Sequence, residues 1–429
     1  MSLWCTRTTY MGFAVRTVDS ELSGVEQYTA EEGGLVRAIR GRDGSISTSF
    51  LPDSTGRGLE PSAASYDLSW LTSPALSISG GGSHVVRVVD LFAGCGGLSL
   101  GVAEACRALG YEMWPVLAND IDARVLSVYG LNFPEAELVD DPIESLLDGS
   151  CGDALTENEK ILKRRIGEID LVIGGPPCQG HSDFNNHTRN DDPKNELYLR
   201  MARFCEVVGP AHVIIENVPG VERDRHQVAQ RTWSRLSDLG YRCDSGIVDA
   251  SRIGVAQRRK RSVTMASLEV SPSVTQAEAE VSVPTRGVMW AIGDLVSSES
   301  DSMFDSSPRP AAVTSDRIDY LFDRGLHDLP DSERPDCHRL KRHSYVSVYG
   351  RMHADLPSQT ITTGFGAMGR GRYVHPTERR TITPHEAARI QFFPDFFTFG
   401  DAGRTLLQKT IGNAVPPKMG YALGLHLLR

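Results

Sequence analysis

The chain lacks several features that mark other classes of protein. Its eight cysteines include no Cys-x-x-Cys pair and none at zinc-binding spacing, which argues against a disulfide framework or a metal cluster and for a reducing compartment. No apolar run is long enough to span a bilayer, and no secretory pattern opens the sequence. We therefore expect a soluble protein of the cytoplasm.

The chain also has no excess of positive charge. Lysine and arginine number 45 against 55 acidic residues, a formal net charge of -10, so the overall charge does not favour a nucleic-acid partner. Any polyanion would have to meet a local basic patch. The length of 429 residues exceeds that of an average domain and favours a division into two.

Residues 1–83 contain few sustained apolar patterns and several glycine- and serine-rich segments. We expect this N-terminal extension to be mostly irregular, and we assign it no function. From Val85 onward, strand-like and helix-like patterns alternate. Strands are expected at 85–92, 114–118, 171–173 and 212–215, and helices at 98–109, toward Tyr129 and at 197–207. This alternation predicts an α/β fold with a mostly parallel sheet.

Cys178 is the most informative residue of the chain. The apolar run 171–173 indicates a buried strand, and the Gly-Gly-Pro-Pro segment after it must end that strand because proline cannot donate to a sheet ladder. Cys178 is therefore expected just beyond the carboxyl end of a strand, where open α/β sheets bind ligands. A thiol there is a candidate nucleophile, although a lone cysteine is more often a packing residue.

A glycine-rich turn occupies residues 90–97, with the sequence Asp-Leu-Phe-Ala-Gly-Cys-Gly-Gly. Such a turn lets the backbone approach a bound ligand closely, and Asp120, after the next expected strand, is placed to accept hydrogen bonds from a ribose. The pattern favours a nucleoside cofactor. A nicotinamide fingerprint would need glycine where Ser99 stands, and a tight helix entry without any ligand is the plain alternative.

Glu216 and Asn217 follow the apolar strand that ends at Ile215, so this carboxyl is expected at the same sheet edge as Cys178. A carboxyl shielded from water can stay protonated near neutrality and donate a proton, whereas an isolated glutamate is more often a solvated or capping residue. The basic run 257–261 offers guanidinium forks for phosphate or carbonyl oxygens and a charge that lowers the pKa of a neighbouring thiol. Most basic runs are only solvated.

Taken in order, these motifs resemble the cytosine-C5 DNA methyltransferase family, and the resemblance runs from Val86 to Arg429. The segments that carry it are 90–97, 175–179, 216–218, 257–261, 383–391 and 412–417. The resemblance implies a Rossmann-like methyltransferase fold with a smaller target-recognition domain. It also implies S-adenosylmethionine as the cofactor, S-adenosylhomocysteine as the product and a cytosine flipped out of double-stranded DNA as the substrate.

The resemblance assigns catalytic roles that the chemistry of cytosine requires. Cys178 would add to C6 of the ring and so break its aromaticity, while Glu216 would donate to N3. Arg261 would hold the C2 carbonyl oxygen, and Arg259 would help to fix the loop or a phosphate near the thiolate. The base that removes the C5 proton is not visible in the sequence.

The same resemblance implies two sets of binding residues. The cofactor contacts are Phe92, Ala93, Gly94, Gly96, Gly97, Asp120, Ile121, Asp141, Ile143, Pro177, Asn413 and Val415. The DNA contacts are Ser182, Gln257, Arg258, Arg370 and Arg372. The polar segment 180–192, which directly follows the nucleophile, is our candidate for a loop that closes over DNA.

We divide the chain into the extension 1–83, a catalytic domain 84–271, a small target-recognition domain 272–402 and a C-terminal return 403–429. We expect a monomer in the bacterial cytoplasm or nucleoid, with double-stranded DNA as its partner and a cognate restriction nuclease as a candidate one. No metal is expected, because Cys337, His338 and His343 are too few ligands. A tRNA C5 methyltransferase and a catalytically silent DNA-binding homologue remain as alternatives.

Overall fold

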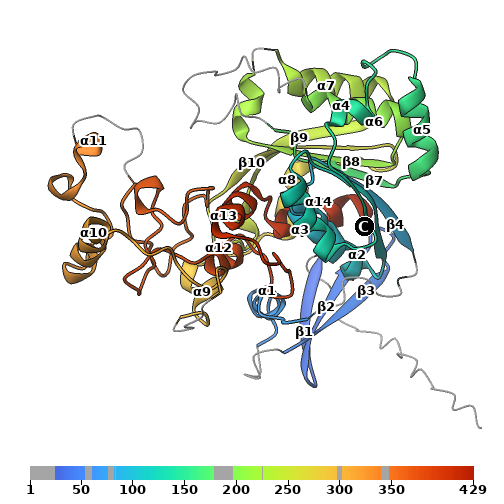
Figure 1. Ribbon diagram of the computed structural model, residues 1–429. Coiled ribbons are helices and arrows are strands. Elements are labelled where there is room, and N and C mark those ends of the chain that lie inside the picture. Colours follow the sequence, from blue (N-terminus) through green and yellow to red (C-terminus); the bar gives the residue numbers. More distant parts are fainter. Residues whose placement is uncertain are drawn as a thin grey trace, which may run out of the picture.

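A computed structural model describes residues 25–53, 60–75, 82, 84–177, 197–224, 226–296, 302–339 and 347–429. Its centre is a seven-stranded sheet in the order β6-β5-β4-β7-β8-β10-β9 (Figure 1). The strands are β4 Val85–Leu91, β5 Glu112–Asn119, β6 Glu137–Val139, β7 Leu171–Gly174, β8 His212–Asn217, β9 Arg242–Asp249 and β10 Lys260–Ser267. Only β10 runs antiparallel to its neighbours, so the predicted mostly parallel sheet is confirmed.

Helices cover both faces of this sheet (Figure 1). One face carries α2 Gly97–Leu109, α3 Ala123–Asn132, α8 Val274–Glu280 and α14 Pro417–Leu428, and the other carries α4 Ile143–Leu146, α5 Glu157–Ile166, α6 Leu199–Val208 and α7 Val228–Asp238. Each face has its own hydrophobic core. The central strands β7 and β8 are therefore buried on both sides, which is why they could be predicted as apolar runs.

Helices α2 and α14 lie unusually close together because glycines stand where they cross. A side chain on Gly101 would clash with the carbonyl of Pro417, and one on Gly420 would clash with the carbonyl of Leu98. This close approach holds the start of α14 against the helix that follows the glycine turn. The packing of α14 thus holds the side of the sheet that carries the glycine turn.

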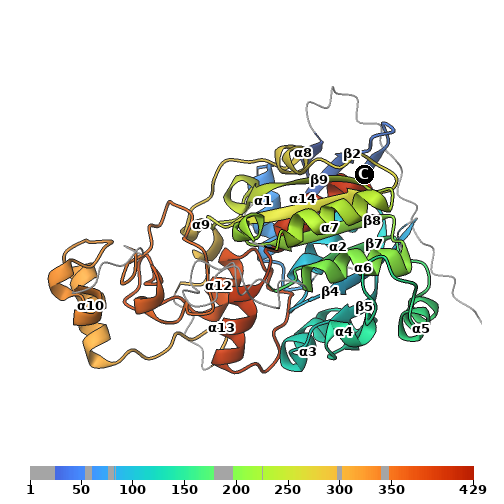
Figure 2. The same cartoon turned by 90° about the horizontal axis from the view of Figure 1, so that it is seen from above.

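A smaller part of the molecule extends to one side of the sheet (Figures 1 and 2). Its helices are α9 Val288–Ile292, α10 Ala312–Asp323, α11 Asp336–Arg339, α12 Pro384–Ile390 and α13 Arg404–Asn413. It has a separate small core that includes Ile318, Leu321 and Val374. Helix α8, within the predicted small domain 272–402, instead contacts β9 and α14, so we propose that this domain begins after α8.

The prediction that the N-terminal extension is mostly irregular is wrong for residues 25–53 and 60–75; most of the rest of 1–83 lies outside the described residues. Residues 25–53 and 60–75, called here the N-terminal module, form an antiparallel sheet of β1 Glu26–Glu31, β2 Gly34–Arg40 and β3 Ile46–Pro52, followed by α1 Ala63–Leu71. Of the segments that suggested a linker, 41–45 forms the turn between β2 and β3, with φ of 84° at Gly44, and Gly33 with φ of 82° stands in the turn between β1 and β2. The segments 53–58 and 79–83 lie largely outside the described residues. Leu35, Ile39 and Leu51 are buried in the core that also contains α2.

Short 3₁₀ turns complete the described structure. They occupy Pro219–Arg223, Ala250–Ile253, Asp331–Glu333 and Met368–Arg370. Within the described ranges, no helix has both the length and the apolar character that a membrane span requires.

Candidate active site

The carboxyl ends of β4, β7 and β8 meet at one edge of the sheet. Leu91 pairs with Gly174, and Gly174 pairs with Ile215. The residues that follow these positions, Phe92, Gly175 and Glu216, therefore leave neighbouring strands at the same level. Three of the predicted motifs come together at this edge, which is where parallel α/β sheets bind ligands.

The glycine turn after β4 has an unusual backbone. Phe92 has φ of 60°, a left-handed conformation that is rare outside glycine and tends to mark functional sites. Gly94 and Gly96 follow with φ of 57° and 91°. The backbone N–H of Gly94 donates to Asp120 Oδ2 at 2.9 Å, so the predicted ribose-binding carboxylate also braces the turn.

A buried polar group lies under this turn. Asp90 is almost fully buried and accepts a hydrogen bond of 2.6 Å from the hydroxyl of Ser99, which lies 3.0 Å from the hydroxyl of Tyr129. Burial raises the pKa of Asp90 to about 8. The sequence reasoning gave Asp90 no role, and it used Ser99 only to disfavour a nicotinamide cofactor. The serine side chain satisfies a buried carboxyl in this fold.

The predicted cofactor residues differ in their exposure. Ile121 is 72% exposed at the end of β5, and a Cβ added to Gly94 would meet no heavy atom within 4 Å. The carbonyl of Val415 lies so close to Gly97 that a side chain there would clash with it, so the closing motif touches the glycine turn. Exposed, half-buried and backbone groups thus border one open surface.

Ile143 and Asp141, two further predicted cofactor residues, differ in their surroundings. Ile143 is buried in the core beside α4, so the structure does not support a side-chain contact with adenine. Asp141 is exposed, but the amide of Asn119 holds its backbone carbonyl at 2.8 Å. Asn413 is exposed at the end of α13, and Pro177 is half-buried at the end of the described Pro-Pro turn.

The Pro-Pro turn is tied directly to β8. The side-chain amide of Asn217 donates to the carbonyl of Pro176 at 3.2 Å. A Cβ added to Gly175 would lie 3.3 Å from Glu216 Oε2. The carboxylate therefore lies beside the segment that leads to Cys178. Cys178 itself lies outside the described residues, as do Ser182 and the predicted loop 180–192.

Glu216 forms an ion pair with Arg261. The Nε of Arg261 lies 2.7 Å from Glu216 Oε1, and the two side chains are 13% and 10% exposed. The pair forms because β10 runs antiparallel to β8, with Val263 opposite Glu216. The predicted acid and the predicted carbonyl-binding arginine are thus together.

Arg259 does not face a phosphate. It is buried, and its guanidinium donates to the backbone carbonyls of Ile361 at 3.0 Å and Ala414 at 2.9 Å. Burial, with Arg261 nearby, holds the pKa of Arg259 well below its usual value. The predicted role at a phosphate is therefore not supported. Arg259 instead holds the closing motif, whose next residue, Val415, touches the glycine turn.

Gln257 was predicted to contact DNA, but its side chain is 0% exposed. Its amide donates to Gln391 at 3.2 Å, and its carbonyl accepts from the backbone of Ile361 at 2.8 Å. In this structure Gln257 joins the two parts of the molecule and cannot reach DNA. Arg258 beside it is exposed, as a phosphate contact requires.

The two arginines predicted in the small part also differ. Arg370 is exposed. Arg372 donates to the carbonyl of His327 at 2.7 Å and pairs with Asp328 at 2.5 Å. Most of the guanidinium of Arg372 is therefore committed to internal contacts, and the prediction that it binds DNA is not supported.

A hollow of about 280 Å³ lies nearby in the small part. Arg309, Arg317 and Tyr349 line it together with the backbone of 366–369. Sequence reasoning missed these residues, because no fixed spacing marks a recognition surface. In the described part of the chain, no cluster of three or more histidine, cysteine, aspartate or glutamate side chains could hold a metal ion.

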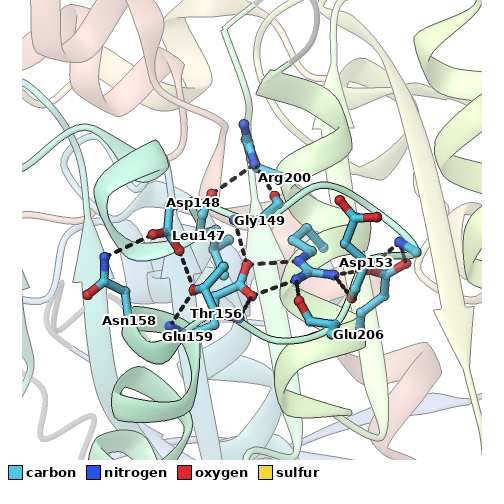
Figure 3. Close-up of polar contacts among 12 residues, drawn as sticks. Leu147, Asp148, Gly149, Asp153, Thr156, Asn158, Glu159, Arg200 and Glu206 are labelled. Atoms are coloured by element: carbon cyan, nitrogen blue, oxygen red, sulfur yellow. Dashed lines mark hydrogen bonds and ion pairs between the residues drawn. The ribbon is translucent and has the colours of Figure 1, made fainter.

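The helix after the undescribed segment 178–196 is anchored by a buried charge network (Figure 3). Arg203 of α6 donates to both oxygens of Glu159 at 2.8 and 2.6 Å and to Glu206 at 2.8 Å. Arg200, one turn earlier, holds the carbonyls of Leu147 and Gly149. The Thr-x-x-Glu capping box that begins at Thr156 was the available sequence signal.

Comparisons with known proteins agree with this geometry. The family described as C-5 cytosine-specific DNA methylase matches residues 86–429. The chain belongs to the C-5 cytosine-specific DNA methylase family. The predicted family is therefore confirmed, as is the predicted enzyme class, DNA (cytosine-5-)-methyltransferase.

Two curated relatives place the chain within this methylase family. The type II methyltransferase M1.BsuMI of Bacillus subtilis is 45% identical over 95% of this chain and 96% of its own length. The type II methylase M.HgiDII of Herpetosiphon aurantiacus is 30% identical over 80% of this chain and 96% of its own. The alignment with M1.BsuMI is long enough that it must include most of the N-terminal module.

Solved structures of methyltransferases share the fold. A putative DNA modification methyltransferase encoded within an E. coli prophage matches 80% of this chain and 98% of its own with a TM-score of 0.55 and 23% identity. The Dnmt2 methyltransferase of S. pombe matches the same shares with a TM-score of 0.52 and 19% identity. The predicted α/β methyltransferase fold is confirmed.

Proposed function

We propose that this methylase transfers the methyl group of S-adenosylmethionine to C5 of a cytosine flipped out of double-stranded DNA, through a covalent adduct between Cys178 and C6. The observation that supports this most is the Glu216–Arg261 pair beside the Pro-Pro turn. It places an acid and a guanidinium next to the segment that carries the nucleophile. A silent homologue would have no use for such an arrangement.

The groups divide the chemistry of the ring among them. The thiolate of Cys178 attacks C6, and the charge that develops at N3 is met by a proton or strong hydrogen bond from Glu216. Arg261 holds the C2 carbonyl oxygen and shares its guanidinium between that oxygen and Glu216. The addition makes C5 nucleophilic, so that C5 would take up the methyl group that the cofactor supplies. Loss of the C5 proton and breaking of the C6–S bond would then restore the aromatic ring and release the thiolate.

The edge after β4 and β5 fits the proposed cofactor. The open face at Gly94, the exposed side chain of Ile121 and the carboxylate of Asp120 suit the backbone approach, the adenine and the ribose of a nucleoside. When bound, S-adenosylmethionine supplies an electrophilic methyl group. The contribution of the chain is to orient it toward the base.

Arg259 is proposed as a positioning residue in place of the direct catalytic role predicted for it. Its contacts run from β10, which also carries Arg261, to the backbone at Ala414. The closing motif in turn touches Gly97. One buried guanidinium thus links the base side of the site to the cofactor side.

The DNA would lie between the sheet edge and the small part. A base must leave the duplex to reach the Glu216 pair, at a cost of a few kcal/mol for unstacking and unpairing. Arg258 and Arg370 are exposed and suit phosphate contacts. We further propose a monomer in the cytoplasm or nucleoid, with a cognate restriction nuclease as a candidate partner.

Labelled S-adenosylmethionine tests the proposal on two polymers. Incubation with plasmid DNA should label the DNA, and bisulfite sequencing should locate the methylated cytosines. A duplex with 5-fluorocytosine at such a position should then remain attached to the wild-type chain and not to the Cys178→Ala variant. Labelling of tRNA alone, or a modified duplex that forms no adduct, would overturn the proposal.

A further inference from the structure

The N-terminal module lies outside the residues that match the family, and it contacts the molecule at the junction between its two parts. In Figure 1 it lies under α2, with α1 on the side toward α9. On α2, Glu104 pairs with Arg37 of the module at 2.8 Å, and Arg107 donates to Tyr66 at 2.6 Å. The module is therefore joined to the helix that follows the glycine turn.

One buried carboxylate of α1 joins three parts of the chain. Asp67 is 3% exposed, and its Oδ1 lies 2.8 Å from the Nζ of Lys418 at the start of α14. Its Oδ2 lies 2.7 Å from Nη1 of Arg286, just before α9. Both cations are nearly fully buried as well. A single anion thus holds two buried cations from different parts of the molecule.

Arg286 stands where the chain enters the small part. Two residues later, Val288 donates its backbone N–H to the carbonyl of Leu356. Met289 likewise donates to the carbonyl of Ala354. This first crossing is therefore bound to a segment deep within the small part. A shift of Arg286 relative to Asp67 would carry that segment with it.

The module also contacts the small part itself, at the turn that follows α12. Trp70 stacks on Phe392, with ring centroids 5.4 Å apart, and meets Phe396 edge-on at 5.5 Å. The backbone N–H of Asp395 donates to the carbonyl of Leu71 at 2.9 Å. The turn that follows α12 is thus held by α1. The same short helix also holds Arg286 at the entry to the small part and Lys418 just after the chain returns to the sheet.

The charge of the module does not suit direct contact with DNA. Its basic residues are Arg37, Arg40 and Arg42, and its acidic residues are Glu26, Glu31, Glu32, Asp43, Asp53, Glu60 and Asp67. This acidic excess would repel phosphates. The alignment with M1.BsuMI covers 95% of this chain, so that relative has residues aligned with the module.

We infer that the N-terminal module is a clamp that sets the position of the small part relative to the sheet, with Asp67 and Trp70 as its positioning residues. The inference rests on the proposed function, because the clamp would act by setting the width and alignment of the DNA cleft. With Arg286 held at the entry and Lys418 just after the return, the small part would keep a fixed position relative to the sheet edge. The small part then loses less conformational freedom when DNA binds, which makes binding more favourable.

The experiment uses the full chain with Asp67→Asn, Trp70→Leu and, as a matched control, Asp43→Asn in the exposed β2–β3 turn of the same module. We expect the first two variants to raise KM for plasmid DNA by about tenfold. The Kd for S-adenosylmethionine, measured by calorimetry, should stay within about twofold in all three. The control should keep the wild-type KM.

A merely structural role would lower the melting temperature but leave KM for DNA unchanged in the folded enzyme, and that result would overturn the clamp. An equal rise of KM in Asp43→Asn would overturn it too. If Asp67→Asn does not fold, Trp70→Leu alone decides the question. If the wild type methylates no DNA, the proposed function fails, and small-angle scattering then tests the clamp, which requires a broader distance distribution in Trp70→Leu than in the wild type.

Discussion

Two glutamate–arginine pairs of this molecule differ in how many hydrogen bonds their carboxylates accept. Glu159, on the α5 side of the sheet, accepts from Arg203 and from the backbone N–H groups of Gly149 and Thr156. Among the described residues, Glu216 at the sheet edge has Arg261 as its one polar side-chain partner. The first pair has used its hydrogen-bonding capacity, and the second has capacity left for a substrate.

The largest expected effect is the loss of the acid at the sheet edge. Glu216→Gln keeps the shape but cannot protonate N3, so kcat should fall by about 10²–10⁴. The Kd for S-adenosylmethionine should stay within about twofold, because the cofactor side of the site is untouched. Single-turnover kinetics and calorimetry measure the two quantities.

The exposed Glu135→Gln is the matched control for that change and should behave as wild type. Cys178→Ala should abolish transfer altogether while the cofactor still binds. Turnover of Glu216→Gln within a few fold of wild type would show that the satisfied and unsatisfied pairs do not differ in function.

For the charge network between α5 and α6, we expect a substitution to lower stability and to leave kcat per folded molecule unchanged. Arg203→Met leaves the buried carboxylate of Glu159 without its cation and removes one of the two cations of Glu206, which keeps Arg235. The free energy of unfolding should fall by about 3–5 kcal/mol. The exposed Arg164→Met should change it by no more than about 0.5 kcal/mol. Denaturant unfolding measures both, and a kcat per folded molecule that fell with the stability would contradict a purely structural role.

Most of the sheet could be predicted from the sequence because its strands are buried on both faces. The runs before Gly175 and Glu216 are continuous and apolar, and the run before Phe92 is mostly apolar, so their ends, and the site at those ends, could be placed. The N-terminal module could not, because its short strands are separated by glycine turns that resemble a linker. Its core contacts come from α2 and α14, far away in the sequence.

The run 257–261 shows why individual roles were harder to predict. Gln257 and Arg259 are buried, Arg258 and Lys260 are exposed, and Arg261 forms the ion pair. The residues alternate as the chain enters β10, but all five are polar. Strand periodicity is detected from alternating polarity, so a run without apolar residues gave no signal.

The buried carboxyl of Asp90 should make the stability of the protein depend on pH. Burial raises its pKa to about 8 in the folded protein, so the folded state holds a proton that the unfolded state has lost. The stability contribution of this group is therefore full in acid and declines as pH rises toward 8. Asp90→Asn cannot ionise and should escape this decline.

The stability difference between Asp90→Asn and wild type should therefore shift in favour of the variant from pH 5 to pH 8. The slope should be at most about 1.4 kcal/mol per pH unit. Denaturant unfolding at several pH values measures it. A difference independent of pH would mean that Asp90 is ionised in the folded protein and satisfied by more than Ser99.

The smallest expected effect distinguishes the exposed Arg258 from Arg372, whose guanidinium is held by internal contacts. Arg258→Ala should weaken binding to all DNA sequences by a few fold and reduce the salt dependence of binding by about one unit of slope, because one phosphate contact is lost. Arg372→Ala should leave that slope unchanged, since its guanidinium already holds His327 and Asp328, and should instead lower the melting temperature. Titrations at several salt concentrations measure the slopes. Equal slopes for Arg258→Ala and wild type would place the DNA away from the 257–261 run, and the cleft would then have to be sought nearer to Arg370 and the hollow at Arg309.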